Sequence, residues 1–222
     1  MLMRRCIRLL SCLAVVAGGL VGSVVVLPGT ADAVSCGTPV AAGSTCTLTG
    51  TASLTGGTLT LTSSGSLGWA TTLNGLNQSL VDTTAADQGY TVNDATGSGA
   101  GWHVTVSATT FTTGTHTLLD TGTFVTNGST SSSTATTAPS ATCTGTCTLP
   151  TNSTTYPVGV TTAASSPTPF TIYDTAAGTG LGQMAIGGST AANPAGWWVN
   201  IPASTQAGTY TSTITMQIIS GP

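Results

Sequence analysis

Threonine alternates with aliphatic or aromatic residues in several short segments of this chain. Thr58 to Thr62 reads Thr-Leu-Thr-Leu-Thr, and from Trp102 to Ser107 every second residue is apolar. Threonine is both β-branched and polar, so this alternation is typical of strands with one buried and one wet face. We find no convincing amphipathic helix after the N-terminal segment, and the sequence predicts an all-β fold. The clearest strand places Tyr210, Ser212, Ile214, Met216 and Ile218 on one face.

Glycine and proline divide the chain into many short strand-like segments. The clearest divisions are at Gly56-Gly57, between Gly97 and Gly101, and at Asn193-Pro194. Short strands separated in this way predict an antiparallel β-sandwich or barrel, Ig-like in its general architecture. The stretch 126–169 breaks the pattern, because it is rich first in Ser, Thr, Ala and Gly and then in Pro and Thr. We expect an irregular Ser/Thr/Pro-rich excursion there.

The first 33 residues have the features of a secretory signal peptide. Three arginines at positions 4, 5 and 8 stand at the start of an apolar run that reaches Leu27, and Ala31-Asp32-Ala33 supplies the small residues of a cleavage site. Cleavage after Ala33 leaves residues 34–222, a length that suits a single β domain. The alternatives are an uncleaved membrane anchor and a lipid attached to Cys36. We predict a secreted protein with no membrane span after cleavage.

Arg4, Arg5 and Arg8 are the only Lys or Arg residues of the chain. Residues 34–222 therefore carry no permanent side-chain cation. Binding to nucleic-acid phosphates depends on Lys and Arg, so this composition excludes a nucleic-acid partner. The acidic residues after position 33 are Asp82, Asp87, Asp94, Asp120 and Asp174.

Four cysteines follow the predicted cleavage site, namely Cys36, Cys46, Cys143 and Cys147. An even number in an oxidising compartment predicts disulfides. A metal site is not expected, because the spacing lacks a matching C-x-x-C repeat and the chain has only two histidines. Three pairings are possible. We favour the two local ones, Cys36 with Cys46 and Cys143 with Cys147, each contributing roughly 2 to 3 kcal/mol.

Catalytic and cofactor motifs are weak. His116 and Asp120 could orient one another, but there is no G-x-S-x-G elbow, and serine is too abundant for a triad to be informative. The glycine-rich runs at 97–101 and 178–182 precede strand-like segments, whereas phosphate loops precede helices. The aspartates around Asp87 lack the spacing of a calcium loop. The sequence predicts no enzymatic activity, no cofactor and no metal.

Three groups of residues, in order, resemble the WxL-domain family. They are Leu67-Gly68-Trp69, the segment from Tyr90 to Val106, and Ile201-Pro202-Ala203 with Ala207-Gly208-Thr209-Tyr210. The resemblance runs from about Leu48 to Ser220. The first Trp-x-Leu motif of the family falls on Trp102-His103-Val104, with Val in place of Leu. The second falls on Met216-Gln217-Ile218, where the tryptophan is absent.

The alternation separates core from surface positions in these motifs. We expect Trp102 and Met216 in the core, because each lies on the apolar face of its strand. The motif or core positions together are Trp69, Trp102, Val104, Trp197, Tyr210, Met216 and Ile218.

The pair Trp197-Trp198 is different, because consecutive strand residues point to opposite faces. If Trp197 is buried, Trp198 and Asn200 face outward, where an indole beside an amide suits a sugar ligand. His103, on the polar face of its own strand, is a further candidate for ligand binding. The alternative is that the Pro-rich excursion covers Trp198.

The resemblance implies a secreted, non-catalytic protein held non-covalently on the outer face of a Gram-positive cell wall. Its partner would be peptidoglycan or an associated wall glycan. Residues 218–222 contain no apolar span and no L-P-x-T-G sequence, so covalent anchoring is not expected. The leading alternative is a structural or assembly subunit that contacts other surface proteins. A secreted hydrolase is a third hypothesis.

Overall fold

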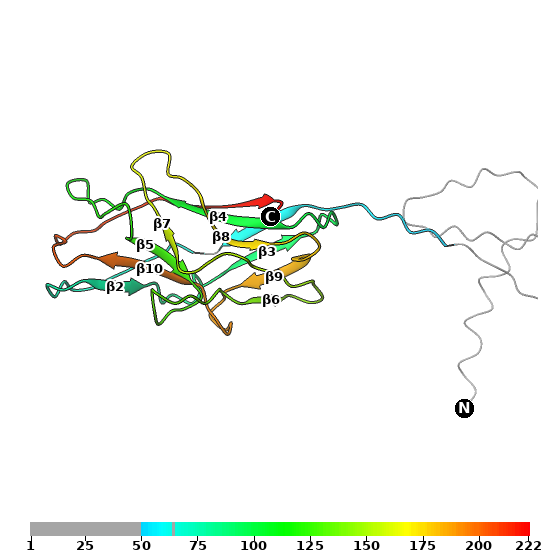
Figure 1. Cartoon of the computed structure of the whole chain (residues 1–222), viewed down its shortest axis with the longest axis horizontal. Coiled ribbons are helices and arrows are strands. Elements are labelled where there is room, and N and C mark those ends of the chain that lie inside the picture. The colour runs from blue at the N-terminus through cyan, green and yellow to red at the C-terminus, as the bar shows by residue number, and fades with distance from the viewer. Residues whose placement is uncertain (1–49, 64) are drawn as a thin grey trace, which may run out of the picture. The chain divides into compact units, whose positions relative to one another are not determined.

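The computed structural model of the protein describes residues 50–63 and 65–222. Every described strand lies within one compact unit, Thr55–Pro222 (Figure 1). The predicted signal peptide and the predicted Cys36–Cys46 disulfide lie outside the described residues, so both stay predictions.

Eleven strands form three antiparallel sheets, and the part of the chain that the structure describes contains no helix. The sheets have the strand orders β1-β3-β9-β6, β2-β10-β5-β7 and β11-β4-β8. This confirms the predicted all-β, sandwich-like fold, whereas the Ig-like detail stays a prediction. The strands are β1 (Leu59–Ser63), β2 (Gln78–Val81), β3 (Tyr90–Asp94), β4 (Trp102–Ala108), β5 (Phe124–Asn127), β6 (Ala141–Cys143), β7 (Val158–Val160), β8 (Phe170–Thr175), β9 (Gly182–Ile186), β10 (Gly196–Ile201) and β11 (Ile214–Ser220).

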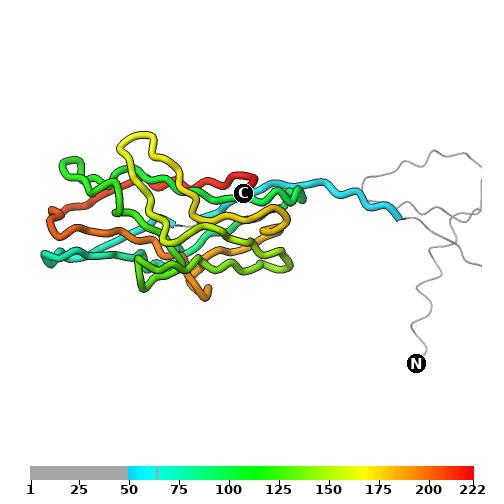
Figure 2. Tube along the Cα trace, viewed as in Figure 1, coloured from blue at the N-terminus to red at the C-terminus, as the bar shows by residue number. Residues whose placement is uncertain are grey.

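The sheets meet along two seams and enclose a common core. β1 packs beside β11, and β7 packs beside β8, so the sheet that contains β4 joins the other two. Figure 2 shows the red C-terminal strand β11 running beside the green β4, with which it pairs over its whole length. All three sheets contribute to the core cluster, whose fully buried members include Val92, Val104, Phe124 and Met184.

Strands β1, β4 and β11 show the predicted alternation. In β4, Trp102, Val104 and Val106 are fully buried, whereas His103 and Ser107 are partly exposed. β1 and β11 repeat the pattern with half-buried apolar residues and exposed threonines. The exception is Thr105, which is buried where the register between β4 and β8 shifts.

The stretch 126–169 is irregular over most of its length, as predicted, but not throughout. It contains the end of β5 and all of β6 and β7, which complete two of the sheets. Thr126 and Asn127 are buried, and the amide of Gly128 donates to the carbonyl of Thr137 at 2.7 Å. The pattern missed these strands because three or four residues are too few to establish a period.

Cys143, at the end of β6, forms a disulfide with Cys147, which confirms the local pairing for these two cysteines. Their Cα atoms are 5.5 Å apart. In the chain-entropy model a loop this short contributes about 2 kcal/mol.

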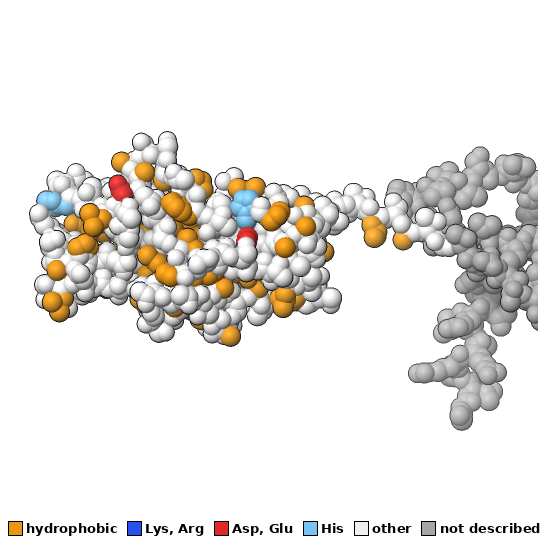
Figure 3. Space-filling view, in the orientation of Figure 1, with side chains coloured by type: hydrophobic (Ala, Val, Ile, Leu, Met, Phe, Trp, Pro, Cys, Tyr) orange, Lys and Arg blue, Asp and Glu red, His pale blue; other side chains and the backbone are white. Residues whose placement is uncertain are grey.

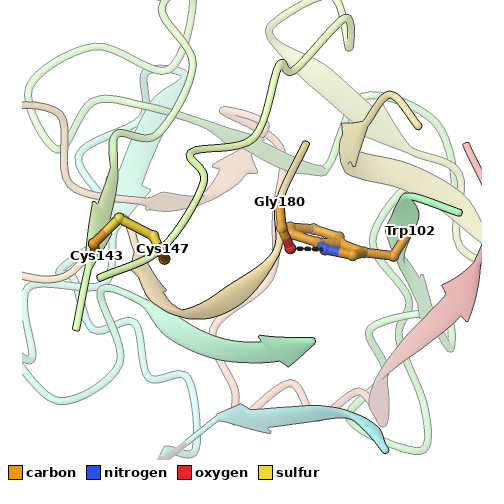
Figure 4. Close-up of a disulfide and its surroundings, with 4 residues drawn as sticks. All are labelled: Trp102, Cys143, Cys147 and Gly180. Carbon is orange, nitrogen blue, oxygen red and sulfur yellow. Dashed lines mark hydrogen bonds between the residues drawn. A yellow bond between two sulfur atoms is a disulfide. The ribbon is translucent and has the colours of Figure 1, made fainter. Parts of the chain in front are cut away.

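The indole Nε1 of Trp102 donates to the carbonyl of Gly180 at 2.9 Å. Figure 4 shows this hydrogen bond together with the Cys143–Cys147 disulfide. A Cβ on Gly180 would lie 2.8 Å from that indole nitrogen, so only glycine fits beside Trp102.

Candidate functional site

A cleft of about 600 Å³ opens between the segment after β1, strand β10 and the start of β11. We call it the aromatic cleft, because Trp69, Phe111, Trp197 and Tyr210 line it. Met216 of β11 also lines it, together with hydroxyl-bearing residues from the segments on either side. The sequence motifs Leu67-Gly68-Trp69 and Ala207 to Tyr210, which lie far apart in the chain, thus meet at one place.

The rings of the aromatic cleft rest on one another. Trp69 meets Phe111 edge-on, with ring centroids 5.9 Å apart, and meets the buried Phe124 in the same way at 6.1 Å. Phe124 in turn stacks on Trp197 at 6.0 Å. Such edge-on and stacked pairs hold each ring in one orientation, so the floor of the cleft is formed before any ligand arrives.

Hydrogen bonds fix the Leu67-Gly68-Trp69 segment against β10. The carbonyl of Trp197 accepts from the indole Nε1 of Trp69 at 2.9 Å and from the amide of Asp82 at 3.0 Å. The carboxylate of Asp82 accepts from the amide of Gly68 at 2.7 Å. Asp82 is fully buried, so its negative charge serves to hold this segment in place.

Asp87 is the charged residue of the cleft lining. Its backbone carbonyl accepts from the indole Nε1 of Trp197 at 3.0 Å, which places Asp87 beside the aromatic floor. The residue is only 7% exposed. Loss of solvent raises the pKa of this carboxyl above its ordinary value, and the nearby negative charge of Asp82 raises it further.

Tyr210 separates the aromatic cleft from a second hollow of about 410 Å³, because it lines both. The hydroxyl of Tyr210 donates to the carbonyl of Gln206 at 3.1 Å. His116, Leu119 and Gln206 contribute to the second hollow. A ligand long enough to pass Tyr210 could therefore contact both hollows.

The two Trp-x-Leu motif positions lie on neighbouring strands. In the antiparallel register of β4 and β11, Val104 faces Ile218 and Val106 faces Met216. Trp102 lies opposite Ser220, at the other end of the pair from the aromatic cleft. The first motif therefore forms core, while Met216 of the second also reaches the cleft.

Comparison with known families agrees with the motifs that converge on this site. A family model described as WxL domain, surface cell wall-binding, matches residues 47–222. The chain belongs to the WxL domain family. Its place is accordingly the cell-wall surface, and the resemblance found in the sequence is confirmed. No curated protein and no solved structure matches the chain.

The prediction that Trp198 projects outward from this WxL domain is wrong. Trp198 is 5% exposed, and its indole Nε1 donates to the carbonyl of Ser129 at 2.9 Å. Trp197 is buried as well, so both faces of β10 are covered. The cover over Trp198 comes from Asn127 and Ser129, at the Ser/Thr-rich start of the 126–169 stretch, whereas the alternative that the sequence left open was a cover by Pro-rich residues.

The other two predicted ligand-binding residues lie apart from the aromatic cleft. Asn200 is partly exposed, but its amide oxygen accepts from the hydroxyl of Ser79 at 2.6 Å, and its amide nitrogen donates to the carbonyl of Gly122 at 2.7 Å. His103 lies between Asp174 and Ile219 in the strand register, and its Nδ1 is 2.7 Å from the carbonyl of Gly221. A role of either residue in ligand binding stays a prediction.

Phe111 and Asp87 are among the cleft residues that the sequence analysis did not predict as site residues. Phe111 belongs to no alternating segment, and Asp87 was considered only as a possible calcium ligand.

Within residues 50–63 and 65–222, no three His, Cys, Asp or Glu side chains come together as a metal site. None of those residues forms a helix with the length and apolar character needed to cross a membrane.

Proposed function

We propose that this WxL domain binds the cell wall non-covalently through the aromatic cleft, and that it does so without catalysis. The ligand is peptidoglycan or an associated wall glycan. The observation that carries the proposal is the convergence of separate motif segments on one preformed cleft, where Trp69, Trp197 and Tyr210 meet. Membership in a family of wall-binding surface domains supports it.

The cleft has the chemistry that a sugar polymer requires. An aromatic ring covers the C–H face of a sugar, and hydroxyl side chains exchange hydrogen bonds with its hydroxyl groups. Trp69 and Tyr210 are partly exposed and supply the rings, while Ser66, Thr211 and Ser212 supply hydroxyls at the rim. The second hollow beyond Tyr210 offers room for a further unit of the same chain.

A binding role accounts for the carboxylates better than hydrolysis does. Glycoside hydrolysis uses two carboxyl groups placed on either side of the scissile bond. Of the two aspartates near the aromatic cleft, Asp87 lines it, whereas Asp82 is fully buried and accepts hydrogen bonds from the amides of Gly68 and Thr84. A single carboxylate in the lining supports contact with a ligand but does not supply the second catalytic group.

Retention on purified wall sacculi from which all protein has been removed tests the proposal. The wild-type protein should sediment with the sacculi, and Tyr210→Ala should reduce retention about tenfold, because a ring shared by two hollows contributes to binding on both sides. Leu76→Ala is the matched control, since Leu76 is 67% exposed and lines neither hollow. The melting temperature of Leu76→Ala should stay close to that of the wild type, and that of Tyr210→Ala should fall only modestly, because Tyr210 is partly exposed although it packs against the core cluster.

Other outcomes of the same assay favour the other hypotheses. Retention only when other surface proteins remain on the wall would favour the assembly subunit, whose contacts would use the outer strands of the sheets. Release of soluble sugars from the sacculi would favour a hydrolase. Full retention of Tyr210→Ala would show that the wall is bound elsewhere on the domain.

A further inference from the structure

Asp87 introduces a negative charge into an otherwise uncharged, aromatic hollow. Its side chain is nearly buried beside Trp197, and the buried carboxylate of Asp82 is close enough to disfavour its ionised form. No Lys or Arg occurs after position 8 of the sequence, so no permanent side-chain cation from residues 9–222 compensates these two carboxylates. A carboxylate held largely away from solvent is unfavourable in its ionised form, and a ligand that brings a positive charge would stabilise the ionised form of Asp87.

We propose that the aromatic cleft binds a protonated amine carried by the wall polymer. The ammonium group contacts the carboxylate of Asp87 and lies against the rings of Trp69, Trp197 and Tyr210. This inference rests on the proposed function and names the chemical group that the site selects. The ligand unit is thus an amino sugar with a free amine.

Aromatic side chains around a carboxylate are the arrangement that favours an ammonium ion over other groups. The face of an indole or phenol ring attracts a cation, and the attraction grows when water is excluded. A charge-assisted hydrogen bond to a carboxylate is about twice as strong as a neutral one. Phosphate or carboxylate ligands would meet only repulsion from Asp87 and Asp82, because the lining of the cleft contains no cation.

Two soluble hexamers that differ only in the charged group test the inference. Chitosan hexamer carries free amines on the same β-1,4 sugar backbone on which chitin hexamer carries neutral acetamides. Binding can be followed by tryptophan fluorescence, because Trp69 and Trp197 line the cleft. The wild-type protein should bind chitosan hexamer at least tenfold more tightly than chitin hexamer.

A pair of charge-matched variants separates the site from the overall charge of the protein. Asp87→Asn should reduce the preference for chitosan hexamer to threefold or less. Asp120→Asn removes the same charge from an exposed position and should leave the preference unchanged. It is a suitable control, because the hydroxyls of Thr110 and Thr162 both donate to Oδ1 of Asp120, an atom that Asn retains. Equal binding of the two hexamers by the wild type, or an undiminished preference in Asp87→Asn, would overturn the inference.

A second measurement needs only the wild-type protein, in case Asp87→Asn fails to fold. Acetylation of the free amines of protein-free sacculi should lower retention of the wild type at least tenfold. If retention is unchanged by acetylation, the amine inference is wrong while the proposed wall binding stands. If the protein does not bind untreated sacculi at all, the proposed function itself is wrong.

Discussion

Trp102 and Trp198 are held in the same way, although they belong to different sheets. Both are almost completely buried, and each indole N–H donates to a backbone carbonyl at 2.9 Å, Trp102 to Gly180 and Trp198 to Ser129. A buried N–H that lacks a partner is strongly unfavourable, so these bonds determine the orientation of each ring as well as its depth. Trp102 also stacks on Tyr173, with ring centroids 6.2 Å apart.

We expect Trp102→Ala and Trp198→Ala each to lower the free energy of unfolding by about 3 to 5 kcal/mol, because each removes a large buried side chain and leaves a cavity. Urea denaturation followed by circular dichroism measures this change. Leu76→Ala, at an exposed position, should change the free energy by less than about 0.5 kcal/mol. A Trp198→Ala variant as stable as the wild type would contradict the burial of Trp198.

The alternation rule predicted Trp102 correctly and Trp198 wrongly for one physical reason. Alternation shows which face of a strand a residue occupies, but it does not show whether that face is covered. Trp198 is covered by the turn around Ser129, about 70 positions away in the sequence, whose serines and glycines give no sign of packing on an indole. The alternation rule fails in the same way for Tyr210, since no local pattern places this residue in the same cleft as Trp69.

At the level of elements, the strands with several apolar positions were predictable and the shortest were not. β4 and β11 carry three or more apolar residues at a spacing of two, which fixes their inward face. β6 and β7 have three residues each, and they are held by pairing with β9 and β5. Only the tertiary fold brings those partner strands close, so local sequence cannot define these elements.

A carboxylate on β8 helps to attach the segment before β7, alongside other hydrogen bonds such as the one that the hydroxyl of Tyr156 donates to the carbonyl of Ile172. Asp174 of β8 accepts hydrogen bonds from the amide of Ser153 at 2.6 Å, from its hydroxyl, and from the amide of Thr154 at 3.2 Å. Burial raises the pKa of Asp174, but the hydrogen bonds from Ser153 and Thr154 outweigh it, and the pKa lies below its ordinary value. Ionised Asp174 therefore strengthens the attachment of the segment before β7 to β8.

Acid should therefore weaken the domain through Asp174. Because the folded-state pKa is lowered, the stabilisation is present above the unfolded pKa of about 3.9 and is lost as pH falls through the folded value. We expect Asp174→Asn to be about 1 to 2 kcal/mol less stable than the wild type at pH 7, given that Asp174 is partly exposed to solvent. The difference should shrink below pH 3, as measured by urea unfolding at a series of pH values. A constant difference down to pH 2 would contradict this role.

At the scale of the whole molecule, the surface is polar but almost uncharged. The face in Figure 3 is mostly white, with scattered orange hydrophobic side chains and no blue Lys or Arg on the coloured residues. The five aspartates after position 33 give residues 34–222 a net negative charge. Long-range attraction to an anionic polymer is therefore not expected, and the proposed binding relies on close-range stacking, hydrogen bonds and the contact of an amine with Asp87.

Wall sacculi freed of their phosphodiester polymers by acid extraction should bind the WxL domain at least as well as untreated sacculi. Those polymers are anionic and repel a domain without Lys or Arg in residues 9–222, so their removal exposes the ligand and lowers the repulsion. The gain should be largest at low ionic strength, where charges are least screened. The bound fraction after sedimentation measures the effect, and a basic reference protein should behave in the opposite way. Lower retention on the extracted sacculi would show that an anionic polymer is the ligand. That result would contradict the ligand class inferred from the absence of cations in the aromatic cleft.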